Sequence, residues 1–149
     1  MTHPGKQWQA IYQQANLSWY DENTVTPQYL ERWVRSEWIM RMLHATKLRH
    51  SPSHHRVLEA GCGTGMYSVC LAMLGFSVDA FDYNIEALKI AQDLTQKIHC
   101  AGYDLNLRFY QQNLLSISIA SDTYNLVFNQ AVLEYFIKGY SDLFCQVAI

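Results

Sequence analysis

The sequence VLEAGCGTG occupies residues 57–65 of this 149-residue chain and joins a short apolar run to a glycine-rich turn. The apolar residues 57–60 are typical of a buried parallel strand. After the turn, residues 65–74 carry apolar side chains at helical spacing, and Gly75 is placed to end that helix. A strand that enters a helix through a glycine turn predicts an open α/β sheet, in which ligands bind where strands end.

The alternation of strands and helices continues after this unit. Residues 77–81 predict a second strand that ends at Asp82, and Asn84 is the expected N-cap of a helix that extends to about residue 98. Residues 105–110 and 124–129 predict two more strands, and a further helix is expected from residue 131 onward. This order implies right-handed crossovers and a mostly parallel sheet covered on both faces.

The first 55 residues have a different character, because aromatic side chains dominate them. Residues 6–16 predict a short helix, and Thr26-Pro27 predicts the start of a long helix that extends to about residue 47. The composition of residues 51–55 indicates a linker. The simplest interpretation of the aromatic residues is that they pack on the sheet.

Charge gives little support for a nucleic-acid partner. The formal net charge is −2, and only 16% of the residues are charged. Residues 1–56 carry seven Lys/Arg against four Asp/Glu, whereas residues 57–149 carry four against nine. Two surfaces of one soluble domain explain this imbalance most simply, and a basic docking arm is the alternative.

The cysteines and histidines do not predict a metal site. No two of the four cysteines form a C-x-x-C pair, and the histidines of residues 50–55 lie in the expected linker. The apolar neighbours of the cysteines favour buried, reduced thiols. No stretch resembles a signal peptide or a membrane span, so we expect a cytoplasmic protein without a membrane association.

Two elements together resemble a known family. VLEAGCGTG followed by VDAFDYN (residues 78–84) is similar to motif I and the acidic strand end of class I S-adenosylmethionine-dependent methyltransferases. FYQQNLLSISIASDTYNLVFNQAVLEYF (residues 109–136) is similar to the third and fourth motifs of that family. The turn departs from the nicotinamide-dinucleotide fingerprint G-x-G-x-x-G, because Met66 takes the place of the third glycine. A nucleotide-dependent oxidoreductase is therefore the weaker alternative.

The resemblance implies a fold and a domain organisation. The expected fold is a Rossmann-like three-layer α/β/α sandwich with a mostly parallel sheet of about four strands, in the order 3-2-1-4, preceded by N-terminal helices. Residues 1–55 would form a helical cap or lid segment, and residues 56–149 a partial methyltransferase domain without strands five to seven of the family. We therefore expect a truncated or interrupted product, or a fragment, whose fourth strand is an exposed edge available for association.

The implied activity is methyl transfer from S-adenosyl-L-methionine to a small-molecule acceptor that the sequence does not identify. A catalytically inactive S-adenosylmethionine-binding fragment or partner subunit is the alternative, since the residues that select substrate usually lie beyond strand four in this family. Closure of a lid over the donor would exclude water from its sulfonium, and Tyr12, Trp19 and Tyr20 are the lid candidates.

The family pattern also implies a cofactor site. Glu59 would orient the ammonium group of the donor, Asp82 would hold the ribose, and Tyr83 would lie against the adenine. Asn113 would contact the adenine amino group, and Asn129 would lie near the methionine portion and the substrate entrance. Carried over position by position, the complete set of cofactor-binding residues is Glu59, Ala60, Gly61, Cys62, Gly63, Asp82, Tyr83, Asn113, Leu114 and Asn129.

The sequence departs from the family pattern at four positions, one of which is Tyr124, where the family commonly has Phe. Asn113 and Asn125 stand where Asp is common, although an amide oxygen still accepts a hydrogen bond. Tyr135 follows Glu134 where the family often has His, so we assign no catalytic base.

Overall fold

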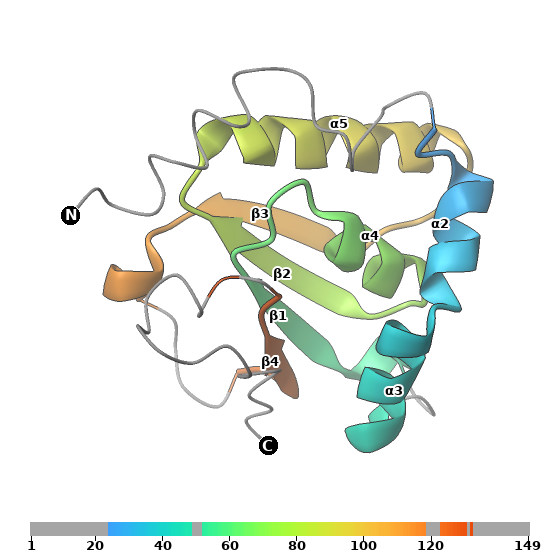
Figure 1. Cartoon of the computed structure of the whole chain (residues 1–149), viewed down its shortest axis with the longest axis horizontal. Helices are drawn as coiled ribbons and strands as arrows, with labels where there is room; N and C mark the ends of the chain where they lie inside the picture. Colours follow the sequence, from blue (N-terminus) through green and yellow to red (C-terminus); the bar gives the residue numbers. More distant parts are fainter. Residues whose placement is uncertain (1–23, 49–51, 119–122, 131, 133–149) are drawn as a thin grey trace.

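A parallel sheet of four strands, in the order β3-β2-β1-β4, forms the centre of the computed structural model (Figure 1). The structure describes residues 24–48, 52–118, 123–130 and 132. The strands are β1 (Arg56–Ala60), β2 (Ser77–Asp82), β3 (Leu107–Gln111) and β4 (Leu126–Phe128). The predicted strand order and the parallel pairing are confirmed.

Two helices follow the strands as predicted. They are α4 (Met66–Met73), after the glycine turn, and α5 (Ile85–Cys100), whose N-cap is Asn84. The Asn84 side-chain oxygen accepts hydrogen bonds from the backbone N–H groups of Glu86 and Ala87, at 2.9 and 3.4 Å. Val57 and Val78 are paired in the register of β1 and β2, and their side chains point to the same face of the sheet. Helices α4 and α5, which connect β1 to β2 and β2 to β3, both pack on this face.

The single long helix that we predicted for the N-terminal part is wrong, because the structure divides this segment into two helices. The structure has α2 (Pro27–Val34) and α3 (Glu37–Ala45), with Arg35 and Ser36 between them. Ser36 is extended, with φ −61° and ψ 149°, and its hydroxyl accepts from the Ile39 N–H as the N-cap of α3. Serine competes with the helix in this way and favours a cap over a helix interior. Thr26 caps α2 as expected.

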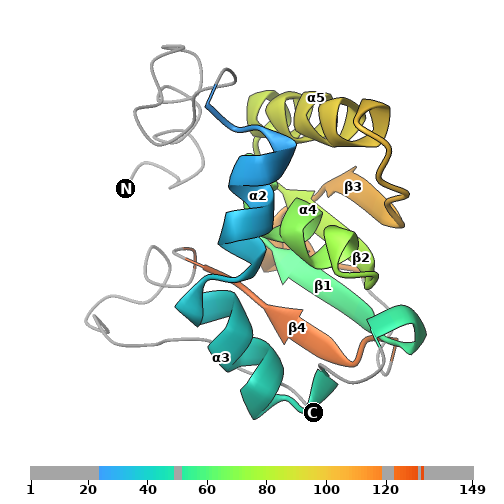
Figure 2. The ribbon, with the colours of Figure 1, turned by 90° about the vertical axis from the view of Figure 1, so that its right-hand side faces the viewer.

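Helix α2 packs on α4, and both share one core with the sheet (Figure 2). The Cys70 thiol of α4 lies 3.8 Å from the Leu30 carbonyl oxygen of α2. Tyr29, Trp33 and Trp38 are half-buried against this core, which supports the packing interpretation for these three residues. The helix predicted over residues 6–16 and the lid candidates Tyr12, Trp19 and Tyr20 lie outside the described residues.

The other face of the sheet carries a smaller apolar cluster. Leu58, Ala60 and Phe81 are buried there, and the short 3-10 helix η3 (Leu114–Ser116) packs over them through Leu114. Among the described residues no α-helix covers this face, because the segment between β3 and β4 contributes only η3.

An ion-pair network crosses the same face. Asp79 of β2 accepts hydrogen bonds from Arg108 of β3 at 2.8 and 3.0 Å, from Arg56 of β1 at 2.9 Å, and from the Tyr124 hydroxyl at 2.8 Å. Burial opposes ionisation of Asp79, but the hydrogen bonds from Arg108, Tyr124 and Arg56 outweigh it and hold its pKa below the usual value. Asp79 therefore links three strands to the segment that enters β4.

The cysteines agree with prediction only in part. Cys62 and Cys70 are buried free thiols, but Cys100 is exposed because it ends α5 on the solvent side, and Cys145 lies outside the described residues. In the part of the chain that is described, no group of three or more potential ligands could hold a metal ion. Within the same part, no helix combines the length and the apolar character that a membrane crossing requires.

Candidate functional site

The glycine turn between β1 and α4 is held in a backbone conformation that glycine adopts most readily. Gly61, Gly63 and Gly65 have φ angles of +76°, +53° and +75°. The N–H groups of Gly61 and Cys62 donate to the Phe81 carbonyl oxygen at 2.8 and 2.9 Å. These two bonds fix the turn to the carboxyl end of β2, beside the residue that ends that strand.

Asp82 lies in direct contact with the glycine turn. One carboxylate oxygen of Asp82 accepts from the Gly63 N–H at 2.8 Å, and the other accepts from the Asn84 N–H, also at 2.8 Å. Burial raises the pKa of Asp82, while the N–H groups of Asn84, Gly63 and Tyr83 act in the opposite direction. Each oxygen has a further lone pair, so the carboxylate is able to accept from two ligand hydroxyls while it keeps both backbone bonds.

Glu59, the second acid of the predicted site, points from β1 toward α4. Its side chain is 2% exposed, and its carboxylate accepts a hydrogen bond from the hydroxyl of Ser68, which is fully buried in α4. The pKa of Glu59 is raised to about 8, mainly by burial and to a smaller extent by the charge of Asp82, against the opposing effect of the hydrogen bonds from Ser68. The site therefore contains two acids, at the carboxyl ends of adjacent strands.

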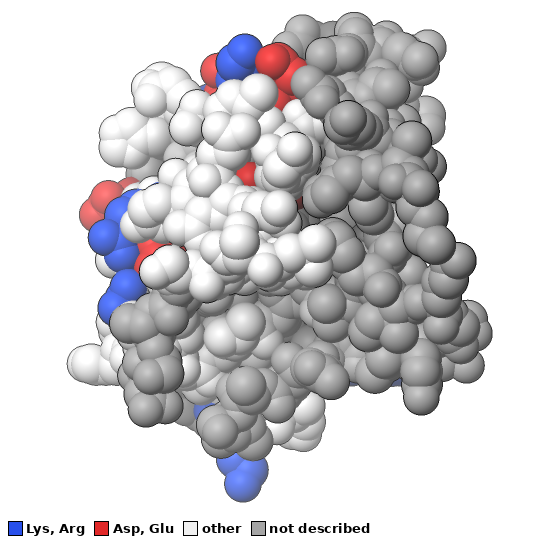
Figure 3. Space-filling model, turned by 90° about the vertical axis from the view of Figure 1, so that its left-hand side faces the viewer, with Lys and Arg blue, Asp and Glu red and all other residues white. Residues whose placement is uncertain are grey.

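Large exposed apolar side chains lie at or shortly after the carboxyl ends of β2 and β3. The four such residues in the described part of the chain are Tyr83, Ile85, Tyr110 and Leu115, which are 43%, 41%, 40% and 67% exposed. Among the described residues on the side of the molecule that holds the strand ends, charged groups lie mainly at the margins (Figure 3). Sequence reasoning identified Tyr83 only; the other three are apolar residues within a few positions of a strand end, a signal that could have indicated them.

The segment after β3 is hydrogen bonded to the carboxyl end of β2. The Gln112 N–H donates to the Asp82 carbonyl oxygen at 3.0 Å, which brings Asn113 next to the end of β2. The Asn113 side-chain oxygen accepts from the Leu115 N–H at 3.0 Å and so caps η3. That oxygen keeps one lone pair for a ligand N–H. Leu114 places its side chain in the apolar cluster on the far face, so only its backbone is available to a ligand.

The end of β4 lies beside the start of α4. Asn129 directly follows β4 and is half-buried. The next side chain, Gln130, hydrogen bonds the hydroxyl of Tyr67 in the first turn of α4. A Cβ atom on Gly61 would come within 2.5 Å of Val132 Cγ2. The predicted site residues of β1, β2 and β4 therefore lie at the same end of the sheet, where these parallel strands have their carboxyl ends.

Asn125 performs a bridging role at the other end of β4. Its side-chain oxygen accepts from the Arg56 N–H at 2.9 Å, and its own N–H donates to the Arg56 carbonyl oxygen at 2.8 Å. An amide is sufficient for this pair of bonds, so the departure from the common Asp leaves the strand pairing intact.

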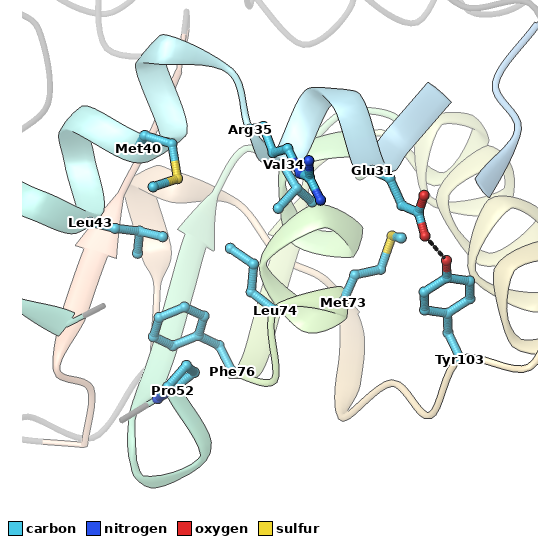
Figure 4. Close-up of a pocket in the computed structure, with 10 residues that line it drawn as sticks. All are labelled: Glu31, Val34, Arg35, Met40, Leu43, Pro52, Met73, Leu74, Phe76 and Tyr103. Carbon is cyan, nitrogen blue, oxygen red and sulfur yellow. Dashed lines mark hydrogen bonds between the residues drawn. The ribbon is translucent and has the colours of Figure 1, made fainter. Parts of the chain in front are cut away.

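A cavity of about 480 Å³ lies elsewhere, among α2, α3 and the end of α4 (Figure 4). Its walls include Leu43, Leu74 and Phe76, and a hydrogen bond between Tyr103 and Glu31 lies to one side of it. Phe76 precedes the amino end of β2, so this cavity lies away from the glycine turn, and no predicted site residue lines it.

The strand order, the glycine turn and the paired acids define a class I methyltransferase domain. A sequence model of the methyltransferase domain family matches residues 57–148, and the chain belongs to that family. It is 32% identical over 71 residues to Methyltransferase phqN of Penicillium fellutanum. It is 34% identical over 62 residues to the probable S-adenosyl-L-methionine-dependent methyltransferase TehB of Haemophilus influenzae.

These matches cover parts of the proteins. The two alignments take in 47% and 39% of this chain, and the chain spans about a fifth of each relative, 21% and 22%. Among solved structures, magnesium protoporphyrin IX methyltransferase (ChlM) from Synechocystis PCC 6803 with bound SAM superposes with a TM-score of 0.64 at 18% identity. That superposition covers 91% of this chain and 65% of ChlM, and it confirms the fold.

Proposed function

We propose that this chain binds S-adenosyl-L-methionine across the carboxyl ends of β1 and β2 and transfers its methyl group to a small-molecule acceptor. The observation that carries the proposal is the bond between the Gly63 N–H and the Asp82 carboxylate, at 2.8 Å. This bond brings the glycine turn next to Asp82 and so supports a single donor site, in which the turn would offer backbone without side chains and the acid would offer paired acceptors.

The residues fit the donor along its length. The Asp82 oxygens would accept the two ribose hydroxyls, and the exposed Tyr83 ring would lie along the adenine. The glycine turn would take the amino-acid part, with Glu59 next to its ammonium group. Asn113 would accept from the adenine amino group with its free lone pair, and Asn129 would border the reacting methyl.

The chemistry requires placement more than proton transfer. The bound donor supplies a methyl group on a positively charged sulfur, which is a good leaving group. The task of the protein is then to align the acceptor, the methyl carbon and the sulfur, and to keep water out. The glycine turn and the two backbone bonds on Asp82 would hold the donor in place. The end of β4 would border the position of the acceptor.

The class of acceptor rests on charge and on fold. With a formal net charge of −2, the chain has no general attraction for the phosphates of nucleic acid. The structure with which it superposes over most of its length is named for a porphyrin substrate. Both observations support a small organic acceptor.

Calorimetry combined with a product assay tests the proposal. We expect S-adenosylmethionine to bind and S-adenosylhomocysteine to form when a panel of small-molecule acceptors is added. Product formed only with RNA would contradict the acceptor class. Binding without product on any acceptor would overturn methyl transfer by this chain, and the absence of binding would overturn the donor site.

Association through the edge of β4 stays a prediction. This strand is the last in the sheet that the described residues build, and an edge strand of this kind can pair with another chain. Light scattering during size-exclusion chromatography checks it, because a monomer at all concentrations would contradict it.

A further inference from the structure

Glu59 is a buried acid whose hydrogen-bond partner is neutral. Its side chain is 2% exposed, and the carboxylate accepts from the hydroxyl of Ser68, which is itself fully buried. Ser68 is the third residue of α4, where backbone N–H groups have no partner inside the helix. Gly65, at the N-cap, has no side chain to cap this helix, and the Ser68 backbone interacts with the Glu59 carboxyl. Ser68 therefore holds this carboxyl at the start of α4.

The groups around Glu59 are acidic or neutral. The Cys62 thiol faces it from the glycine turn, and Tyr67 and Cys70 face it from α4. From the end of β2 comes Asp82, and the residue paired with Glu59 in β4 is Phe128. Among the described residues no Lys, Arg or His forms a salt bridge with Glu59.

A carboxylate that is buried without a positive partner is unfavourable, and such a group keeps its proton instead. Burial raises the pKa of Glu59 to about 8, so the empty site holds a neutral acid at neutral pH. An arriving ammonium group would reverse this balance, because it would supply the positive partner that Glu59 does not have among the described residues.

We propose that Ser68 is a positioning residue that holds the Glu59 carboxyl at the start of α4, that burial keeps this carboxyl neutral in the empty site, and that binding of the donor ammonium releases its proton to solvent. The O–H bond of the Glu59 carboxyl breaks, and its electron pair stays on the oxygen. The ammonium keeps its three protons and pairs with the new carboxylate. This inference rests on the proposed donor site.

Titration calorimetry of the full chain at pH 6.5, in two buffers of different ionisation enthalpy, counts the protons released. At this pH the donor α-amino group is charged, because its ordinary pKa is about 7.7–8.0. We expect close to one proton released for each S-adenosylmethionine bound. The matched ligand is 5′-methylthioadenosine, which has the adenosyl group without the ammonium, and it should release almost none.

Variants separate this account from a purely structural role of Ser68. Glu59→Gln should bind the donor without releasing a proton. Ser68→Ala should weaken donor binding about tenfold, as expected when a hydrogen bond to a charged group is lost, whereas Ser68→Thr keeps the hydroxyl and should restore the affinity and the proton count. If Ser68→Ala does not fold, the two ligands on the wild-type chain decide the question.

The outcomes also separate this inference from the proposed function. If neither ligand binds, the donor site itself is wrong. Donor binding without proton release overturns only the inference about Glu59 and Ser68. The same proton count in wild type and Glu59→Gln would overturn it as well, because the proton would then come from another group.

Discussion

At the scale of single residues, the two acids of the site differ in what holds them. Asp82 accepts from two backbone N–H groups, which a folded chain provides whether or not a ligand is bound. Glu59 accepts a hydrogen bond from the hydroxyl of Ser68 and is fully buried. In the proposed site, Asp82 would accept ligand hydroxyl groups while it keeps its two backbone bonds, whereas Glu59 would stay neutral until a cation binds.

Asp82→Asn should weaken binding of S-adenosylmethionine by about tenfold to a hundredfold. The amide removes the charge and replaces one acceptor oxygen by a donor, so charge-assisted hydrogen bonds to the ribose are lost. Calorimetry measures the effect. Asp93→Asn is the matched control, because Asp93 is an exposed carboxylate of α5 outside the site. Equal affinities of Asp82→Asn and Asp93→Asn would contradict the assigned role.

Glu59 should make the stability of the chain depend on pH. Its pKa rises from an ordinary 4.5 to about 8 on folding, so the folded state binds a proton that the unfolded state releases between these values. Stability from this group is full below about pH 4.5 and is lost as pH rises through 8, by at most about 1.4 kcal/mol per pH unit.

Urea unfolding of wild type and Glu59→Gln at pH 5.5 and pH 7.5 checks this dependence. The stability of the variant relative to wild type should increase with pH, because glutamine does not titrate. Glu37→Gln, a change at an exposed helix position, should keep the wild-type dependence. A difference between Glu59→Gln and wild type that stays constant with pH would exclude a protonated Glu59.

At the scale of elements, glycine at the start of α4 is required for two separate reasons. Gly65 has a φ of +75°, and a Cβ there would lie 2.8 Å from the Ala91 Cβ of α5 and 3.0 Å from the Phe109 Cζ of β3. Helix α4 therefore approaches α5 and β3 as closely as it does only because this position has no side chain.

Gly65→Ala should cost about 2–4 kcal/mol of unfolding free energy, from the left-handed backbone together with overpacking. Gly102→Ala is the control, because Gly102 has a similar φ of +98° and nothing within 4 Å of the added Cβ. That variant should cost only about 1–2 kcal/mol. Chemical denaturation measures both, and equal losses would show that the contact with α5 and β3 is unimportant.

The Asp79 network should stabilise the pairing of the strands. Asp79→Asn should lower the unfolding free energy by about 1–3 kcal/mol at pH 7, in the lower part of that range because both arginines are partly exposed. The folded pKa of Asp79 lies below its usual value, so this contribution is present above the unfolded pKa and is lost as pH falls through the folded one. An unchanged urea midpoint of Asp79→Asn at pH 7 would contradict a stabilising role of this network.

The periodicity of apolar residues predicts the helices and strands. It does not predict their boundaries where a polar side chain determines them. Apolar spacing was sufficient for β1, β2, α4 and α5, because these elements bury nearly every apolar residue that marks them. The break at Ser36 was not visible, since the apolar spacing continues across it and only the capping bond reveals it. Strands β3 and β4 begin two residues later than predicted, after side chains such as Asn125 that bond across the sheet.

The predicted site depends on motifs, and the structure adds the contacts between them. Glu59 and Asp82 stand out as acids at strand ends, but no spacing rule indicates that Asp82 reaches the Gly63 N–H or that Ser68 holds Glu59. Both contacts join residues that come together only after β1 pairs with β2 or packs on α4. Tyr110 and Leu115 were missed for a similar reason, because an apolar residue near a strand end resembles core until its exposure is known.

At the scale of the whole molecule, the sheet has two ends with different properties. The carboxyl ends of the strands carry the glycine turn, two acids and exposed apolar side chains, whereas the cavity near Phe76 lies toward the amino end of β2. The strand order places β1 beside both β2 and β4, so the turn after β1 has a neighbour on either side. This arrangement brings the glycine turn, Glu59 and Asp82 together at the carboxyl end of the sheet, which is where open α/β sheets bind ligands.

Equilibrium binding of S-adenosylmethionine to the intact chain, with nicotinamide adenine dinucleotide as competitor, tests the central claim most directly. We predict saturable binding of one donor per chain, displaced by S-adenosylhomocysteine and unaffected by the dinucleotide. Tighter binding of the dinucleotide, or no binding of any adenosyl compound, would contradict it.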